Sequence, residues 1–489
     1  MILVRTLALS ALVLLMGCPS ETPVTETTAS TPPPATDTTL TGTVTSVPPD
    51  PCNQTVTAGG VVQMPPIVIS GNIPVAVPLP QQVNSPLQVR PNFDWFSWTE
   101  FIALNWPASS QGRGNPENPS DPNTFRNAPS GTPTVWGTYK ANWELFDQGS
   151  QRPTPFDSYD VPVPPKCAVK AGQKALVMTS KGNTVLDDGV EAFSFPLVDA
   201  QRNYLMYEVR YGRAAYDFMR GPDADPSKWL YLAKNLTPPT QQSMPSSTQN
   251  PDVAGAIMMK AAWRMMSSVP EDQRGRYYVA DAQVYDPSTD QCTVQQVGLV
   301  GLHIAQKVNG LPEWVWSTFE HLDVLTTDTQ PGLLAPCAAG DTNCSQVHGF
   351  ANRPVSTKLI ADPTKRTPVN AARINPIPTT PDGAGTDAVN AAFQKALAGT
   401  VWANYQLIVT QWPFNPGTFK APDNNGTYPC WSGDPFPVAG AVNLTMETYF
   451  QSAQDALATA TSGGNGCMGC HYGAALYDFS WGLKRRPHA

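Results

Sequence analysis

The strongest constraint on how this chain can fold is a series of short strand-like segments between residues 172 and 323. They are apolar or alternate between apolar and polar residues, and Gly, Pro, Asp or Asn bounds each of them. In the clearest case, residues 296–323, two β-rich runs flank the sequence VNGLPE, in which Asn309 and Gly310 form a natural hairpin turn. The 51 prolines, about twice the usual share, also favour extended segments over long helices. We therefore expect a body built mostly of antiparallel sheet.

Apolar residues at helical spacing predict helices around this sheet. The segments concerned are residues 94–107, 134–146, 387–400 and 443–460. Asp94 and Asn443 are expected to cap the first and the last of these helices, and residues 401–413 predict a further strand. The predicted fold class is α+β, a mostly antiparallel β body with peripheral helices and a short C-terminal helical segment for cofactor attachment.

The first 18 residues differ from the rest of the chain. Arg5 precedes an apolar stretch at residues 7–16, and Gly17 and Cys18 follow it. This order predicts a signal peptide, which is too short to remain as a membrane-spanning helix. The sequence Leu-Met-Gly-Cys resembles the bacterial lipobox, in which cleavage leaves Cys18 as a lipid-carrying N-terminus; an ordinary cleaved signal that ends near a cysteine is the alternative. The signal peptide and lipobox predict an extracytoplasmic, lipid-anchored protein. Because Pro19 is not the Asp that retains some lipoproteins at the inner membrane, we expect the outer membrane of a Gram-negative bacterium, with the protein facing the periplasm or the surface.

Composition divides the remainder into three parts. Residues 19–50 are Thr, Pro and Ser with almost no large apolar group, so they cannot bury enough surface to offset the entropy lost on ordering. We expect a disordered Thr/Pro-rich tether there, a β-rich α+β body at residues 51–440 and a separate C-terminal segment at residues 441–489. The formal charge of −8 argues against a nucleic-acid partner, because the phosphates of nucleic acids require a basic face.

The nine cysteines suggest disulfides as well as cofactor chemistry. Once Cys18 and the two cysteines of the C-terminal motif are set aside, an even number remains for an oxidising compartment. These are Cys52, Cys167, Cys292, Cys337, Cys344 and Cys430. Up to three disulfides are expected, with about 15 possible connectivities. Cys337 and Cys344, which flank AAGDTN in a polar loop, are the pair we join first; buried free thiols are the alternative.

The sharpest motif lies near the C-terminus, where residues 465–475 read NGCMGCHYGAA. Cys467, Cys470 and His471 form a Cys-x-x-Cys-His unit, the attachment sequence of c-type haem. In one helical turn, residues at i, i+3 and i+4 share a face, so both thiols can bond to haem vinyl groups while His471 binds the iron. We therefore expect one covalent haem c with His471 as the proximal iron ligand, and residues 441–489 as the haem-binding segment.

Three other interpretations of the motif are weaker. A thioredoxin-like redox disulfide would need a strand-to-helix context, whereas Gly-rich residues precede Cys467. Zinc would need four ligands, and no second pair of cysteines or histidines lies near the motif in the sequence. A structural disulfide between residues three positions apart would be strained.

A sixth iron ligand would have to come from upstream of the motif, because no methionine follows His471. His303, in an apolar strand, and His321, at the end of the partner strand, are the candidates, with Met446 ranked after them. Gly301 is small and leaves room for something flat beside His303. A hairpin loop of even length would place the two strand histidines on opposite faces of the sheet, and one of odd length on the same face. Either histidine can instead be an ordinary core or edge residue.

Several stretches of the chain resemble a known family. In chain order, these stretches are FIALNWP, KAAWRMM, VGLVGLHIAQK, WVWSTFEHLD, NLTMETYF and CMGCH followed by DFSW. Together they resemble exported bacterial proteins of the cytochrome c family, over about residues 93–483. The resemblance implies covalent haem at Cys467, Cys470 and His471, and it implies no substrate.

The expected function is that of a membrane-tethered c-type cytochrome that binds one haem and transfers electrons. Its partners would be a redox protein or a small-molecule electron donor or acceptor, and the membrane through the N-terminal lipid. One alternative is a haem-dependent, peroxidase-like oxidoreductase with an open iron site, in which Glu320 and His321 act as acid–base groups. Another is a binding or sensor lipoprotein with structural haem. The sequence leaves open whether the chain is an enzyme.

Overall fold

The computed structural model describes a large part of the chain. The described residues are 66–78, 89–162, 167–169, 174–177, 197–236, 243–247, 253–286, 289–311, 314–325, 332–336, 368–373, 376–379, 385–413, 435–436, 443–447, 471, 474 and 477–485. All of them belong to one compact unit, Gln54–Ala489. The predicted signal peptide with Cys18, the tether at residues 19–50, and Cys467 and Cys470 lie outside the described residues. Among those described, no helix has the length and apolar character needed to cross a membrane.

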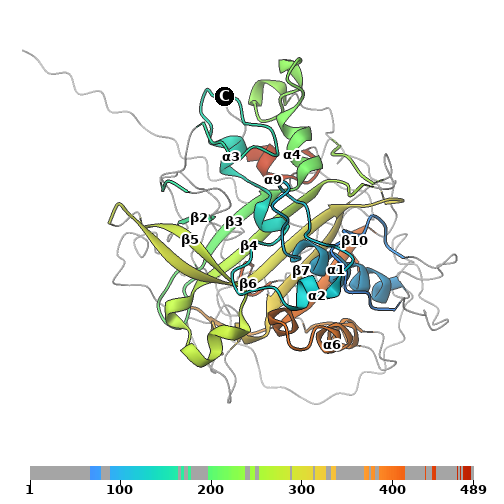
Figure 1. Cartoon of the computed structure of the whole chain (residues 1–489), viewed down its shortest axis with the longest axis vertical. Coiled ribbons are helices and arrows are strands. Elements are labelled where there is room, and N and C mark those ends of the chain that lie inside the picture. The colour runs from blue at the N-terminus through green and yellow to red at the C-terminus, as the bar shows by residue number, and fades with distance from the viewer. Residues whose placement is uncertain are drawn as a thin grey trace, which may run out of the picture. The chain divides into compact units, whose positions relative to one another are not determined.

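The described part is organised around one 9-stranded sheet (Figure 1). Its hydrogen-bonded order is β1-β3-β4-β6-β7-β10-β11. Off this path, β5 pairs antiparallel with β6, and β2 pairs parallel with β5. The strands are β1 Lys140–Ala141, β2 Lys174–Val177, β3 Met206–Tyr211, β4 Ile257–Met265, β5 Val279–Asp286, β6 Gln291–Lys307, β7 Trp314–His321, β10 Tyr405–Pro413 and β11 Pro435–Phe436. A separate parallel pair joins β8 Ala335–Pro336 to β9 Asn370–Ala371.

Short helices surround this sheet. They are α1 Arg90–Leu104, α2 Pro122–Arg126, α3 Trp143–Phe146, α4 Arg213–Arg220, α6 Thr386–Ala396 and α9 Trp481–Arg485. In Figure 1, α9 lies beside α3 and α4, near the top. The predicted α+β class, with a mostly antiparallel sheet and peripheral helices, is confirmed.

The predicted hairpin at residues 296–323 is confirmed as β6 and β7. Residues 308–313 connect the two strands, an even number, and Gly310 takes the positive φ of +77° that the turn requires. The register pairs Gly301 with Glu320 and His303 with Thr318. Since side chains alternate along a strand, His303 and His321 point to opposite faces of the sheet, the outcome predicted for an even loop.

We name the two faces of the sheet after residues that they carry. On β7, Trp316, Thr318 and Glu320 share a face with His303, and this is the His303 face. The other is the Phe319 face. Since each face buries apolar side chains, the sheet lies between two layers of packing.

Helices α1 and α6 cover the Phe319 face through aromatic packing. Phe101 stacks on Phe319 with ring centroids 4.3 Å apart, and Trp98 stacks on Phe393 at 5.4 Å. All four rings are almost fully buried, which stabilises the fold by about 1.5–3 kcal/mol for each such side chain. Trp98 and Phe101, which lie in the predicted helix at residues 94–107, are therefore core residues.

Two details of the predicted helices are wrong. The first helix begins at Arg90, so Asp94 is an interior residue; its carboxylate is fully buried and accepts hydrogen bonds from Thr386 and Thr410 at 2.7 Å each. Residues 134–146 do not form one helix, because Lys140–Ala141 leave the helical path to pair with β3 as β1. Of the predicted helix at residues 443–460, only 443–447 are described; there, the Asn443 side chain accepts the Thr445 N–H at 2.9 Å, as a cap does.

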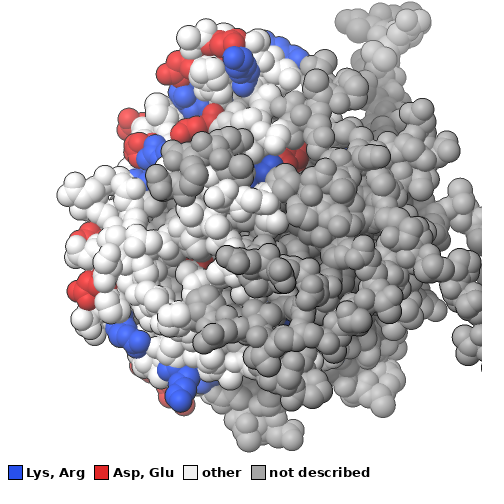
Figure 2. Space-filling view, turned by 90° about the vertical axis from the view of Figure 1, so that its right-hand side faces the viewer, with Lys and Arg blue, Asp and Glu red and all other residues white. Residues whose placement is uncertain are grey.

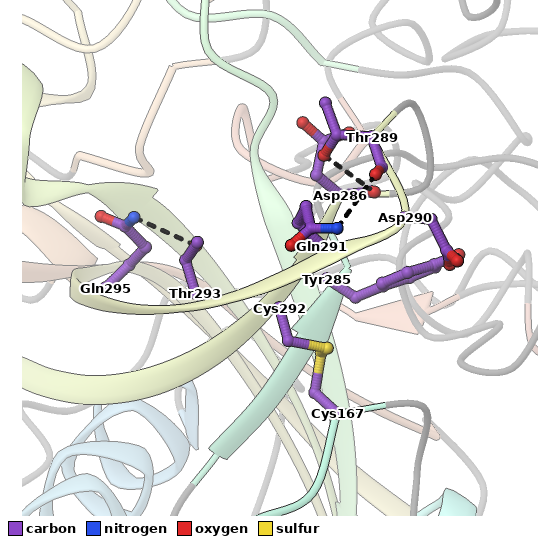
Figure 3. Close-up of a disulfide and its surroundings, with 9 residues drawn as sticks. All are labelled: Cys167, Tyr285, Asp286, Thr289, Asp290, Gln291, Cys292, Thr293 and Gln295. Atoms are coloured by element: carbon purple, nitrogen blue, oxygen red, sulfur yellow. Dashed lines mark hydrogen bonds between the residues drawn. A yellow bond between two sulfur atoms is a disulfide. The ribbon is translucent and has the colours of Figure 1, made fainter.

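A disulfide joins Cys167 to Cys292 and fixes the outer end of β6 (Figure 3). The two cysteines are 125 positions apart in the sequence. Figure 3 shows the bridge below the turn that joins β5 to β6, close to Tyr285. The pair that sequence suggested first, Cys337 and Cys344, lies outside the described residues.

Candidate functional site

The last described segment places His471 against the His303 face of the sheet. The imidazole ring lies 4.4 Å from the ring of Trp316, centroid to centroid. Trp316 pairs with Ala305 on β6, one step along the same face from His303. The structure therefore brings His471 and His303 to one side of the central strands, although they are far apart in the sequence.

Hydrogen bonding fixes which nitrogen of His471 carries the proton. Its Nδ1 lies 2.7 Å from the carbonyl oxygen of Phe479, so Nδ1–H donates and Nε2 keeps its lone pair. Nε2 has no hydrogen-bond partner among the described residues. Burial lowers the pKa of His471 to about 4, and charges on His303 and Lys260 act in the same direction. At neutral pH the ring is uncharged with a free Nε2, which is the form that binds a metal ion.

The carbonyl that orients His471 belongs to an unusual turn. Asp478 and Phe479 are consecutive residues with φ of +50° and +60°, and neither is glycine. A left-handed non-glycine residue costs on the order of 1–3 kcal/mol and persists only where surrounding contacts hold it in place. Since this turn directly supports the imidazole, the strain lies at the point where His471 is held.

Buried contacts from the sheet hold the turn. Lys307, the last residue of β6, places its ammonium 2.9 Å from the Asp478 carboxylate, and their side chains are only 2% and 3% exposed. The indole N–H of Trp314, the cross-strand partner of Lys307, donates to the Asp478 carbonyl at 3.0 Å. The backbone N–H of Met244 donates to the same carboxylate at 2.6 Å. Burial raises the pKa of Asp478, and the Lys307 ammonium opposes that rise.

The other polar cluster on this face is built on His303. Its Nε2 lies 2.8 Å from the Glu447 carboxylate, and its Nδ1 is buried with no hydrogen-bond partner among the residues that the structure describes. Lys260 is the neighbour of His303 on β4 in the same cross-strand row. Burial opposes ionisation of Glu447, but its contact with His303 and the charge of Lys260 lower its pKa overall. His303 thus presents one nitrogen held by a carboxylate and one available nitrogen.

His321 lies on the opposite face and has no available nitrogen. Its Nε2 donates to the Arg276 carbonyl at 3.1 Å, and its Nδ1 accepts the Asp323 N–H at 3.0 Å. The ring stacks on Tyr277 with centroids 3.9 Å apart. Burial lowers the pKa of His321 to about 4. This geometry is that of a core histidine, the ordinary alternative for this residue, and it does not bring His321 to His471.

The segment at residues 443–447 closes over the Gly301 end of the His303 face. The Asn443 side chain donates to the Phe319 carbonyl at 2.8 Å, and Glu320 accepts the Leu444 N–H. Thr445 fills the space over Gly301, so the flat vacancy expected beside that glycine does not exist. The absence of a side chain at Gly301 lets the segment at residues 443–447 pack directly against β6.

Two further candidates from the sequence have structural surroundings. Glu320 forms an ion pair with Arg373, and both carboxylate oxygens are engaged. Met446 is fully buried in an apolar cluster that includes Ala262 and Val300. Neither contacts His471 through any described interaction.

Sequence reasoning did not identify Lys307, Trp314 or Asp478 as site residues. A signal was present, because residues 303, 305 and 307 alternate onto one face of a strand and the WVW sequence places Trp314 and Trp316 opposite them. The position of Asp478 over this row depends on a contact between segments distant in sequence, which no local pattern shows.

No group of three or more His, Cys, Asp or Glu side chains suited to a metal ion occurs among the described residues. Cys467 and Cys470, which complete the motif around His471, are not among them. Comparisons of this chain with protein-family models, curated proteins and solved structures find no match.

Proposed function

We propose that the protein is an extracytoplasmic, lipid-anchored c-type cytochrome that carries one haem and transfers electrons. Cys467 and Cys470 would bind the haem covalently, and His471 would bind the iron through Nε2. The observation that carries the proposal is the hydrogen bond from His471 Nδ1 to the Phe479 carbonyl. A partner on the second nitrogen is what fixes the ring orientation of a metal-binding histidine.

Other features of the His303 face fit a group bound beside His471. The indole N–H of Trp316 and Nδ1 of His303 are both buried and have no hydrogen-bond partner within the described part of the chain. An unsatisfied buried polar atom costs about 1–3 kcal/mol, so two of them on the His303 face favour a bound polar or metal-containing group. When present, haem supplies a one-electron couple between Fe(II) and Fe(III). The residues around it would orient the imidazole and exclude water from it.

For the sixth iron position, the geometry favours His303 over the other candidates. His303 shares a face with His471 and keeps Nδ1 available, whereas His321 lies on the opposite face with both nitrogens bonded. Met446 lies in a separate apolar cluster. Glu447 would hold His303 from its other side through Nε2.

The charge distribution on the described surface indicates which kind of redox partner it suits. Figure 2 shows scattered charged residues of both signs between broad uncharged areas, with no large patch of one sign on the described part of that face. Long-range attraction of a highly charged partner is therefore not favoured there. A redox protein that docks through uncharged surface, or a small-molecule electron donor or acceptor, suits this surface better.

The peroxidase-like alternative has less support. Its proposed acid–base groups were Glu320 and His321, and Glu320 is held by Arg373 and by the backbone of Leu444. His321 faces away from His471. Neither carries a free group toward the proposed iron site.

The direct test is covalent haem attachment. The full chain, expressed in a host that matures c-type cytochromes, is denatured and extracted with acid acetone, with Cys467→Ala as the matched control. We expect the red colour to stay with the wild-type polypeptide. Absorption spectra are then recorded in both oxidation states, before and after carbon monoxide is added. Low-spin iron that does not bind carbon monoxide indicates electron transfer, whereas high-spin iron that binds it indicates catalysis or sensing. Colour that leaves with the solvent, or never appears, refutes the proposal.

A further inference from the structure

We propose that Asp478, Lys307 and Trp314 are positioning residues that set the orientation and donor strength of His471 through the carbonyl of Phe479. The inference rests on the proposed function, because it concerns the residue assigned to the iron. It goes beyond that function by assigning a role to a buried ion pair and an indole that lie outside the attachment motif.

The first step is that the turn's own backbone hydrogen bonds, such as that from the Phe479 N–H to the Ala474 carbonyl at 3.0 Å, act against an unfavourable backbone conformation. Asp478 and Phe479 both take left-handed backbone angles, which non-glycine residues avoid when nothing constrains them. Released from its contacts, this pair would move toward the right-handed or extended region. Either movement reorients the peptide that carries the Phe479 oxygen, and the 2.7 Å bond to His471 would be lost.

The second step is that the sheet supplies the constraint. Trp314 binds the backbone of Asp478 through the carbonyl, and Lys307 binds its side chain. These two residues are paired across β6 and β7, so their spacing is fixed by the hydrogen-bond ladder. Met244 adds a third contact from a different segment. The position of the turn is therefore fixed relative to β6 and β7, the two central strands that carry Lys307 and Trp314.

The third step concerns chemistry. An imidazole that donates Nδ1–H to an oxygen is a stronger electron donor at Nε2, because second-sphere hydrogen bonding raises ligand basicity. A stronger donor favours the oxidised metal. Loosening the turn should therefore weaken the donor and shift the equilibrium toward the reduced form at a fixed solution potential. The shift is measured as a rise in the midpoint potential.

The experiment compares three variants of the full chain with a matched control. Trp314→Phe keeps an aromatic ring but removes the N–H that binds the Asp478 carbonyl, together with part of the buried ring. Asp478→Ala removes the carboxylate while keeping a residue that disfavours left-handed angles. Asp478→Asn is the conservative variant, since asparagine tolerates those angles and keeps one acceptor oxygen. The control is Glu208→Gln, which disrupts a buried ion pair with Lys174 on the opposite face of the sheet.

Two measurements are made on each variant. The midpoint potential reports donor strength, and the ¹⁵N spectrum of histidine-labelled protein in the reduced state reports whether His471 keeps its proton on Nδ1. We expect Trp314→Phe and Asp478→Ala to raise the potential and to lose or broaden the Nδ1–H signal. Asp478→Asn should recover much of both, and Glu208→Gln should lower stability and change neither.

The outcomes separate this inference from the proposed function. If the chain carries no haem, the proposed function fails, while the ¹⁵N spectrum still shows whether these residues hold the His471 proton. If haem is bound but Trp314→Phe and Asp478→Ala keep the wild-type potential and Nδ1–H signal, the positioning role is wrong and the proposed function stands. Should Asp478→Ala fail to fold, Trp314→Phe alone decides, because it preserves an aromatic ring at that position.

Discussion

Gly301 lies so close to Thr445 that a methyl group on its Cα would stand 2.0 Å from the threonine hydroxyl. The hydroxyl cannot easily turn away, because it donates to the Asn443 side chain at 2.6 Å. The central strand and the segment at residues 443–447 are therefore in contact without room for any side chain between them. This contact closes one end of the His303 face.

The first prediction follows from that contact. Gly301→Ala should destabilise the protein by about 1–3 kcal/mol, the usual cost of forcing an extra methyl group into a packed interior. Urea denaturation checks it. Gly275→Ala is the control, since nothing lies within 4 Å of the position that its methyl group would occupy. Equal midpoints for the two variants would contradict the described packing.

A second prediction concerns the disulfide between Cys167 and Cys292. Its two cysteines are 125 positions apart, so the bridge removes much of the freedom of the unfolded chain. Replacing both residues by serine should lower the free energy of unfolding by about 2–5 kcal/mol. Denaturation of the double variant beside oxidised wild type measures this, and reduced wild type should behave like the variant.

A third prediction is a loss of stability in acid that originates at His321. Burial lowers its pKa from 6.5 to about 4 in the folded protein. Between these values the unfolded chain binds the proton and the folded chain does not, so stability is complete above pH 6.5 and falls as the pH approaches 4. The contribution amounts to about 3 kcal/mol, from 1.36 kcal/mol per pKa unit.

The measurement compares wild type with His321→Gln, which keeps a donor and an acceptor but cannot be protonated in this range. The difference in unfolding free energy between the two proteins should change between pH 6.5 and 4 and should be constant above that window. A constant difference throughout would show that His321 titrates normally in the folded state.

A fourth prediction tests the sixth iron position. With haem bound as proposed, His303→Ala should convert low-spin iron into a high-spin form that binds carbon monoxide, because the imidazole proposed for the sixth position is removed. His321→Gln, on the opposite face, should leave the spectrum low-spin. Absorption spectra with and without carbon monoxide distinguish the cases; an unchanged His303→Ala spectrum would remove this residue as a ligand.

A fifth prediction tests the anchor. Cys18→Ser should abolish incorporation of labelled fatty acid and release the protein from the membrane fraction, because the acyl chains provide the proposed attachment. Fractionation of cells that express the two forms measures this. A Cys18→Ser protein that still sediments with membranes would point to another means of attachment.

Local sequence patterns predicted the parts of this fold that depend on neighbours in the chain. The Asn309-Gly310 turn predicts the β6–β7 hairpin, and an even loop length predicts that His303 and His321 lie on opposite faces of the sheet. The start of α1 was misplaced because Asp94 resembles a cap, whereas its carboxylate is held inside the core by Thr386 and Thr410. Tertiary contacts from distant segments decided that position.

The candidate site shows the same division. The Cys-x-x-Cys-His unit drew attention to His471 from spacing alone. The partners that hold His471 come from β6, β7 and the turn at Asp478, and they meet only after the sheet has formed. No pattern within a window of the sequence relates Lys307 to Asp478, so their buried pair could not have been predicted.

The turn at Asp478 also limits how far the segment that follows it can be truncated. Terminal residues of a domain often fray and accept truncation, yet Phe479 and Leu483 are buried in the main apolar cluster. Trimming the chain to before Leu483 would open that cluster and free the support of His471 together with it. Residues 479–483 therefore belong to the folded core and are poor positions for truncation or for an inserted tag.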